Sequence, residues 1–248
     1  MFEPGASAAE GDHPVDPPAD REVASVPEQA SRQRLIAVLA VAAIALAGTL
    51  AFELMQEEDN RPAGAWTVTP YQGLGAWIDV YDWTDEFTGG DPPVGLDDID
   101  AMAEAGIQTV FVQVAHNRSA DDVSEPERLD SIIDKAHDRG MHVVAWYLPT
   151  LVDPATDLRR LVAASELDVD GLGVDIESVE IADPAERTRR LVELSHDLRA
   201  EIGADKHLSA ITLTAVHLEV VNRDYWPGYP WPELADTYDS ILPMAYWS

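Results

Sequence analysis

Short apolar runs alternate with amphipathic stretches along the chain from about residue 73 onward. Six apolar runs occupy residues 76–83, 109–116, 141–149, 171–177, 207–213 and 239–247. Their starts lie roughly thirty to thirty-seven residues apart, which is the length of one strand–helix unit. Each run is bounded by polar or turn-forming residues and is short enough for a buried strand. The pattern therefore predicts six strands.

Between these runs, apolar residues recur at the spacing of a helix face. One stripe ends before Gly140, a plausible helix stop, and a second lies between Pro184 and Gly203. The stripes consist of Leu129, Ile132, Ile133 and Ala136; Leu191, Leu194, Leu198 and Ile202; and Leu158, Leu161 and Val162. Each stripe predicts an amphipathic helix between two strands.

Strands and helices that alternate at a steady period predict an α/β fold with a parallel sheet. An open, doubly wound sheet is the alternative. A TIM-type (β/α) barrel is favoured because the repeat is even, no glycine-rich phosphate loop follows the first run, and polar or aromatic residues end most runs. A full barrel needs two further units, so we expect a barrel truncated after six strands or an open sheet.

A different pattern precedes this domain. The 18 residues from Leu35 to Phe52 carry no charge and span roughly 27 Å as a helix, close to the thickness of a bilayer core. Arg32 and Arg34 precede the segment and acidic residues follow it, so the N-terminus is expected to be cytoplasmic. A buried core helix or a cleavable signal peptide is the alternative.

The predicted organisation is a disordered acidic tail at residues 1–34, a transmembrane helix at 35–54, a linker at 55–72 and the barrel at 73–248. This organisation predicts a single-pass protein of the cell membrane whose C-terminal domain is extracytoplasmic. Formal net charge is −30, from 46 acidic and 16 basic side chains, which argues against nucleic acid as a partner. The chain has no cysteine, and no residues show metal-ligand spacing, so no metal or cofactor is predicted.

The segment from Asp170 to Glu177 carries the clearest candidate chemistry. Alternate side chains of a strand face the same way, so Asp175 and Glu177 share a face, roughly 6.6 Å apart along the backbone. Gly173 falls on that face and is expected to leave space beside them. Two acids that point into a barrel are unfavourable unless they are paired, protonated or used. The structural alternative is that one acid bonds backbone or arginine while the other faces solvent.

This segment resembles the fourth-strand signature of glycoside hydrolase family 18, the chitinase-like barrels, which reads D-x-x-D-x-D-x-E. Asp170, Asp175 and Glu177 match its first, third and fourth positions, while Gly173 stands where the family has its second Asp. The sixth run ends in Met-Ala-Tyr-Trp, similar to the family's Met-x-Tyr-Asp. Residues 73–248 also resemble membrane-anchored glycosyl-hydrolase-like barrel proteins of actinobacteria.

The resemblance implies a retaining mechanism with assistance from the substrate. It gives Glu177 the role of general acid and Asp175 that of orienting a 2-acetamido group, with Tyr246 bonding the same group. Substrate-binding candidates at the ends of the runs are Asp79, His116, Trp146, Tyr147 and Trp247. Each candidate has a structural alternative. The aromatic residues could pack in the core, Asp79 and Asp82 could cap the loop, and His116 could be an ordinary hydrogen-bonded histidine.

Aromatic residues also fill the run WPGYPW at 226–231, whose prolines and glycine predict an irregular loop with its rings at the surface. Aromatic planes stack on the apolar faces of sugars, which suits a carbohydrate ligand. The sequence therefore predicts a membrane-anchored glycosidase that acts on a polysaccharide. A non-catalytic carbohydrate-binding barrel and an envelope scaffold remain alternatives, and the oligomeric state stays open.

Overall fold

A computed structural model of the chain describes residues 66–245, and the fold is given for these residues. The strands are β1 (Gly75–Ile78), β2 (Thr109–Gln113), β3 (His142–Tyr147), β4 (Gly171–Ile176), β5 (Leu208–Leu213) and β6 (Ser240–Met244). The helices are η2 (Thr69–Tyr71), α2 (Val80–Trp83), α3 (Asp85–Thr88), α4 (Leu96–Glu104), α5 (Pro126–Asp138), α6 (Pro154–Ser165), α7 (Pro184–Ile202), η3 (His217–Val221) and α8 (Trp231–Thr237).

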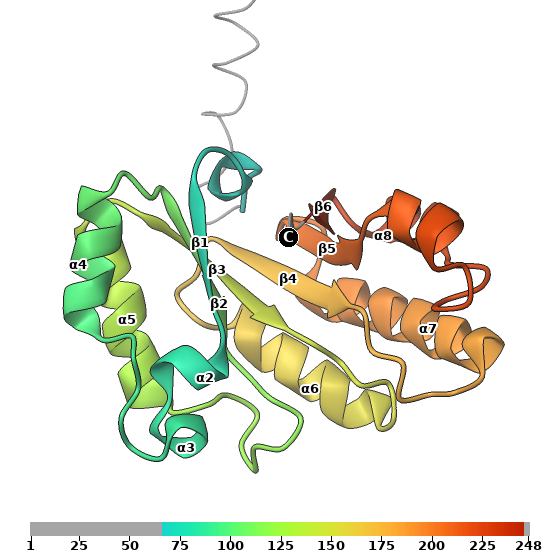
Figure 1. Cartoon of the computed structure of the whole chain (residues 1–248), viewed down its shortest axis with the longest axis horizontal. Coiled ribbons are helices and arrows are strands. Elements are labelled where there is room, and N and C mark those ends of the chain that lie inside the picture. The colour runs from blue at the N-terminus through green and yellow to red at the C-terminus, as the bar shows by residue number, and fades with distance from the viewer. Residues whose placement is uncertain (1–65, 246–248) are drawn as a thin grey trace, which may run out of the picture. The chain divides into compact units, whose positions relative to one another are not determined.

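All six strands form one parallel sheet in the order β1-β2-β3-β4-β5-β6. Because crossovers between parallel strands are right-handed, a sequential order places the connecting helices on one face of the sheet. A doubly wound sheet would instead reverse its order at a switch point. The strand order thus confirms barrel-type winding over six strands. Figure 1 shows α4, α5, α6 and α7 following the outside of the fanned strands in chain order.

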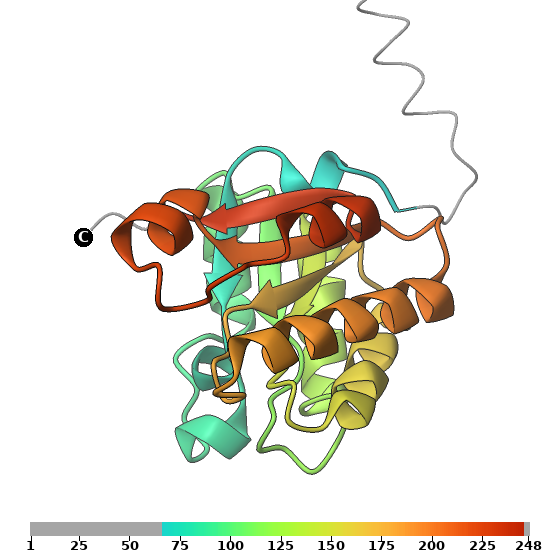
Figure 2. The same cartoon turned by 90° about the vertical axis from the view of Figure 1, so that its right-hand side faces the viewer.

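The helices begin where their sequences predict. The carboxylates of Asp153 and Asp183 accept hydrogen bonds from backbone N–H groups in the first turns of α6 and α7, and a proline follows each of them. Helix α7 ends at Ile202, and its C-cap is Gly203, whose φ of 78° suits a residue without a side chain. All three predicted helical stripes are confirmed, and Figure 2 shows α6 and α7 packed side by side.

The expectation of one strand over residues 76–83 is wrong in its second half. Strand β1 ends at Ile78, and Asp79 becomes the N-cap of the short helix α2. The Asp79 carboxylate accepts the N–H of Tyr81 at 2.7 Å, while the carboxylate of Asp82 accepts the N–H of Asp79 at 2.9 Å. This reciprocal capping box stabilises a helix turn where hydrophobicity alone suggested a longer strand.

The main core lies between the outer face of the sheet and the helices. Alternate residues of the strands supply one side of it, and the predicted helical stripes supply the other. Its fully buried members include Val110, Val112, Val143, Ala145, Leu172, Val174, Leu161, Leu191 and Leu198. The remaining strand residues face inward, away from the helices, because side chains alternate along a strand. This opposite side of the sheet is termed the inner face.

Strand register fixes which inner-face residues lie level with one another. Trp77 is level with Phe111, and Trp146 is level with Gly173 on β4. Near the start of β4, Tyr71 of η2 lies over Gly171, where any Cβ atom would overlap the tyrosine hydroxyl group. The Tyr71 hydroxyl donates to the Leu172 carbonyl at 3.3 Å. Tyr71 therefore fills the inner face at its N-terminal end and leaves the C-terminal end for a site.

Among residues 66–245, no helix is both long and apolar enough to cross a bilayer. The predicted transmembrane segment at residues 35–54 lies outside the described residues, as do the predicted tail and most of the linker.

Candidate active site

Two carboxyl groups lie at the C-terminal end of β4 on the inner face. Asp175 is the last inner-face residue of the strand and is only 6% exposed. Its Oδ1 atom is buried and has no hydrogen-bond partner among the described residues. Glu177 follows immediately after the strand and is half-buried. The structure therefore places both acids as strand alternation predicts, at the end of the strand where barrel folds carry their sites.

The environment of this pair favours a shared proton. Burial, followed by the charge of Glu177, raises the pKa of Asp175 to about 8. Burial also raises the pKa of Glu177 above that of an ordinary glutamate. Neighbouring carboxyl groups titrate as a pair, and the first negative charge hinders the second. Near neutral pH this pair therefore retains a proton that simple surface acids would have lost.

The surroundings of Gly173 correct one expectation. The space at the position of a Gly173 side chain is not empty, because the side chain of Ile211 on β5 occupies it. A Cβ atom at position 173 would come within 2.7 Å of Ile211 Cδ1 and 3.4 Å of Ser209 Oγ. Ile211 is level with Asp175 and is 2% exposed. An apolar neighbour thus stands beside Asp175, which accounts for the strong effect of burial on its pKa.

A row of aromatic rings crosses the inner face from β1 to β3, the strand next to β4. The rings of Trp77 and Phe111 stack at 4.2 Å with an interplanar angle of 6°, and Trp146 lies 6.0 Å from Trp77. Trp77 is 46% exposed despite its size. The Nε1 atom of Trp146 is buried without a hydrogen-bond partner among the described residues. Exposed ring faces with a few unsatisfied polar atoms are typical of a small-molecule site.

Tyr147 and Asp79 occupy other environments. Tyr147 follows Trp146 and therefore faces the helices, fully buried, with its hydroxyl donating to Asp157 at 2.7 Å. Arg160 donates to the same hydroxyl at 3.2 Å, so Tyr147 belongs to a buried polar network. Asp79 is the N-cap of α2, in agreement with the alternative prediction that it caps the loop. The structure does not bring either side chain into contact with the acid pair.

His116 lies after β2, beside the first two strands rather than the fourth. Its ring contacts Tyr81 at 5.9 Å and Phe87 at 4.7 Å between centroids. Its Nδ1 atom accepts the N–H of Arg118 at 3.1 Å, and burial, then Arg118, lowers the pKa of the histidine. His116 is thus a neutral, partly buried group. It lies at the C-terminal end of the sheet, as the acids do, but next to β1 and β2 instead of β4. Tyr246 and Trp247 lie outside the described residues.

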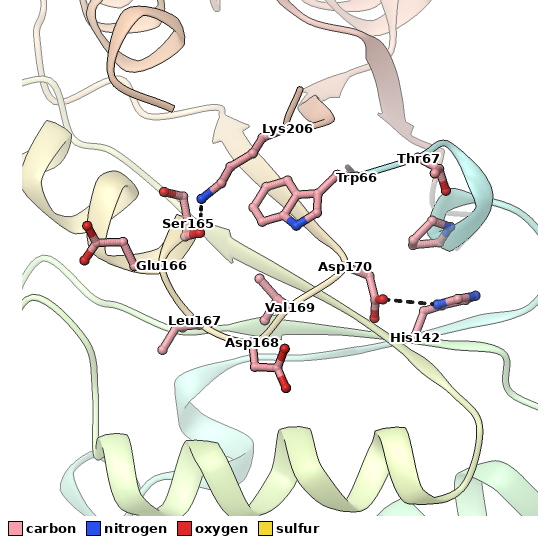
Figure 3. A pocket seen from close by; sticks show the side chains of 11 residues that line it. Trp66, Thr67, His142, Ser165, Glu166, Leu167, Asp168, Val169, Asp170 and Lys206 are labelled. Carbon is pink, nitrogen blue, oxygen red and sulfur yellow. Dashed lines mark hydrogen bonds and ion pairs between the residues drawn. The ribbon is translucent and has the colours of Figure 1, made fainter. Parts of the chain in front are cut away.

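Asp170, the first acid of the motif, points to the opposite end of β4. Its Oδ2 atom accepts the N–H of Val143 at 2.8 Å and lies 3.0 Å from His137 Nε2. Figure 3 shows its contact with His142 in a hollow of about 500 Å³ at the N-terminal ends of the strands. Burial alone would raise the pKa of Asp170, but the hydrogen bonds from His137 and Val143 hold it below the usual range. This acid therefore joins strands and has no contact with the acid pair.

The loop at 226–231 also differs from expectation. Its irregular backbone is confirmed up to Pro230, but Trp226 and Tyr229 are 2% and 8% exposed, so the prediction that they lie at the surface is wrong. Tyr225, directly before this loop, lies at the end of β4, where its hydroxyl donates to the Glu177 carbonyl at 2.6 Å. No pattern in the sequence indicated this contact, because Tyr225 lies outside the aromatic run at 226–231. Within residues 66–245, no three histidine, aspartate or glutamate side chains are grouped to hold a metal ion.

Comparisons with known proteins add little at the level of sequence. No family model matches the chain, and no curated protein matches it. Among solved structures, a chitinase from Bacteroides thetaiotaomicron overlaps with 13% identity and a TM-score of 0.46, over 70% of this chain and 53% of the chitinase. The chitinase domain of a Clostridium difficile spore coat protein gives 14% identity and 0.44, over 75% and 52%.

A Proteus mirabilis N-acetylneuraminate lyase overlaps almost as well, with 10% identity and a TM-score of 0.41, over 68% of this chain and 56% of the lyase. The chain spans about half the length of the chitinase structures it matches. With TM-scores below 0.5, these overlaps support no conclusion about chemistry or ligand. The function must therefore be inferred from the geometry of the chain itself.

Proposed function

We propose that this domain is a glycosidase-like barrel in which Asp175 and Glu177 act on a polysaccharide bound across the inner face. The observation that carries the proposal is the acid pair at the end of β4, with one oxygen buried and unpartnered and with both pKa values raised. Perturbed acids in such a position are typical of a catalytic site. Two carboxyls that share a proton can serve as acid and as electrostatic partner in glycoside cleavage.

Exposure distinguishes the roles of the two acids. Glu177 is the more accessible one, so it is assigned to protonate the leaving sugar oxygen. Asp175 lies deeper, and its unpartnered Oδ1 atom is free to accept an N–H from a ligand such as a 2-acetamido sugar. That hydrogen bond would favour the ionised form of Asp175 and leave the shared proton on Glu177.

The aromatic row supplies the platform for the sugar rings. Trp77 on β1 and Trp146 on β3 lie on the same inner face as the acids, and sugars stack on aromatic ring faces through their C–H groups. His116 and Asp79 lie at the first two strands, where a longer chain of sugars would extend. Tyr246 and Trp247, which the motif resemblance assigns to the 2-acetamido group and to substrate binding, remain predictions.

The test uses the full chain in detergent micelles with chitotetraose, and cellotetraose as a matched oligosaccharide without acetamido groups. Chitotetraose should be cleaved, and Glu177→Gln should reduce turnover roughly 10²–10⁴-fold while binding is retained. Asp175→Asn should also reduce turnover. Cleavage that persists unchanged in Glu177→Gln would show that the general acid is another residue. The absence of both binding and cleavage for every glycan tried would refute the proposal.

A non-catalytic carbohydrate-binding barrel is the second candidate. The observation in its favour is Ile211, whose side chain fills the place where a second aspartate side chain would have to lie. If turnover needs the acid that Gly173 lacks, the aromatic row would still bind sugars. Binding of chitotetraose without cleavage, lost in Trp77→Ala, would select this candidate.

The site is also proposed to face the outside of the cell. The support is the uncharged segment from Leu35 to Phe52, with arginines before it and acids after it. Protease added to intact cells should degrade the region after Glu57 and spare residues 1–31. Protection of the C-terminal domain would contradict this orientation, and release of a soluble domain during export would indicate signal cleavage instead.

A further inference from the structure

Residues 222–230, between η3 and α8, bridge the acid end of β4 and helix α7. These residues are termed the clamp segment. The Tyr225 hydroxyl donates to the Glu177 carbonyl at 2.6 Å, and the Tyr229 hydroxyl approaches the Ile176 carbonyl at 3.5 Å. On the other side, Trp226 Nε1 donates to Thr188 Oγ1 on α7 at 2.9 Å. The clamp segment thus contacts two consecutive backbone carbonyls where β4 ends.

A buried cation fixes the clamp segment on α7. Arg187 is 3% exposed, lies 4.4 Å from the centre of the Trp226 ring, and donates from Nη1 to the Tyr225 carbonyl at 3.3 Å. Its Nε atom is buried without a partner, and no carboxylate of the described residues lies within ion-pair distance. Burial lowers the pKa of its guanidinium.

Burying an unpaired cation is unfavourable, and an apolar side chain would pack equally well against the Trp226 ring. The guanidinium provides two things that an apolar side chain lacks. It donates to the Tyr225 carbonyl, and its charge is attracted to the face of the indole. The first interaction holds Tyr225, which contacts Glu177, and the second holds its neighbour Trp226. Arg187 is therefore better explained by fixing the clamp segment than by packing.

We propose that the clamp segment positions Glu177 for its role in the acid pair, with Tyr225 as the positioning residue and Arg187 with Trp226 as the anchor on α7. This inference rests on the proposed function of the pair. Tyr225 holds the backbone of Glu177, which fixes the direction of its side chain at the strand end.

The charged and titratable groups around Glu177 fit this arrangement. Asp175 lies two residues earlier on its own strand, Tyr225 and Tyr229 belong to the clamp segment, and Arg187 lies behind them on α7. The pKa of Tyr225 is raised by burial and by Glu177 and Asp175, and lowered by Arg187, so Tyr225 stands between the acids and the cation. Loss of the contact between Tyr225 and the Glu177 carbonyl would therefore change the hydration of the Glu177 carboxyl.

The test compares Tyr225→Phe with Tyr238→Phe in the full chain, with ¹³C-labelled glutamate side chains and the Glu177 signal assigned from Glu177→Gln. Tyr225→Phe keeps the ring but loses the hydrogen bond to the Glu177 carbonyl. The backbone of Glu177 is then no longer held, its carboxyl can turn toward water, and its titration midpoint should fall by about half a pH unit or more. Tyr238 is the matched control, since its buried hydroxyl bonds Ser195 at 2.9 Å on the same helix α7. Tyr238→Phe should lower the thermal midpoint without moving the Glu177 titration.

Arg187 gives a second, independent variant. Arg187→Met should move the Glu177 midpoint in the same direction. Arg187→Lys retains a donor for the Tyr225 carbonyl, so its Glu177 midpoint should stay close to that of the parent chain. The double variant with Tyr225→Phe should shift the midpoint by less than the sum of the two, because both act through one contact. A Glu177 midpoint that stays unchanged in Tyr225→Phe and Arg187→Met would overturn the proposal, whatever their thermal midpoints.

This titration needs no substrate, so it separates the clamp from the proposed function. If chitotetraose is cleaved, Tyr225→Phe should reduce kcat about tenfold with KM within about twofold, and the pH–rate profile should move with the Glu177 midpoint. If no glycan is cleaved but the midpoint moves as expected, the clamp stands and the glycosidase assignment fails.

Discussion

Asp175→Asn should stabilise the protein at alkaline pH, which is unusual for a change in a buried polar residue. Asp175 is 6% exposed and its Oδ1 atom has no partner, so its ionised form is poorly compensated. Its pKa rises from 3.8 to about 8 on folding. A carboxyl whose pKa is raised in the folded state binds its proton more tightly there, so stability falls as pH rises from about 4 to 8.

The magnitude follows from linkage. Each pH unit between the unfolded and folded pKa values changes the free energy of unfolding by roughly 1.4 kcal/mol, which gives an upper limit of roughly 4 kcal/mol between pH 5 and pH 8. Water that enters the site on ionisation reduces this, so we expect about 2–4 kcal/mol. Asparagine does not ionise, so Asp175→Asn should match the parent chain near pH 5 and exceed it by that amount at pH 8.

The assay is urea unfolding in detergent micelles, followed by tryptophan fluorescence at both pH values. Asp157→Asn is the matched control, since Asp157 is 2% exposed but accepts from Tyr147 and from the N–H of Leu151. An amide can no longer accept both bonds, so the control should be destabilised by about 1–3 kcal/mol at pH 5, where Asp175→Asn should match the parent chain. If Asp175→Asn shows the same stability difference from the parent chain at pH 5 and pH 8, the raised pKa of Asp175 is refuted.

Three further predictions concern neighbouring parts of the fold. Gly173→Asp should lower the thermal midpoint, because the new side chain would overlap that of Ile211. Adding Ile211→Ala should recover much of the loss. Equal midpoints for the single and double variants would contradict the packing described. His137, whose hydrogen bond to Asp170 raises its pKa, should stabilise the fold fully below about pH 6.5 and progressively less above it, so His137→Gln should cost about 0.5–1 kcal/mol at pH 6 and less at pH 8.5 in urea unfolding. Trp77→Ala should weaken chitotetraose binding about tenfold, as measured by calorimetry. Trp83→Phe, which changes a fully buried tryptophan of the core in α2, should leave binding unchanged.

Much of the fold was predictable because the outer face of the sheet and the helices follow simple periods. Leu129 to Ala136 form a helix stripe, and the Asp183-Pro184 pair marks a helix start, so local rules sufficed. Strand alternation likewise placed Asp175 and Glu177 on one face. The same rule shows that adjacent residues cannot share a face, so Trp146 and Tyr147 could have been separated from the sequence alone.

The remaining features depend on contacts between distant segments. Ile211 fills the place beside Asp175 only because β4 and β5 pair with Gly173 level with Ser209, a register that the hydrophobic pattern does not specify. Tyr225 reaches the Glu177 carbonyl from 48 residues further along the chain. Its loop was recognisable as irregular, but the burial of its rings depends on where α7 places Arg187. Local patterns predict elements, whereas the site is built from their packing.

The two ends of β4 show how structure and proposed function are divided within one strand. At the N-terminal end, Asp170 accepts two hydrogen bonds and its pKa is lowered, so its charge stabilises the fold. At the C-terminal end, Asp175 lacks a partner for one oxygen and its pKa is raised, so its charge destabilises the fold. If Asp175 had only a structural role, asparagine at this position would make the fold more stable at neutral pH. A buried, unsatisfied acid beside a second acid is instead the arrangement expected where a ligand supplies the missing partner.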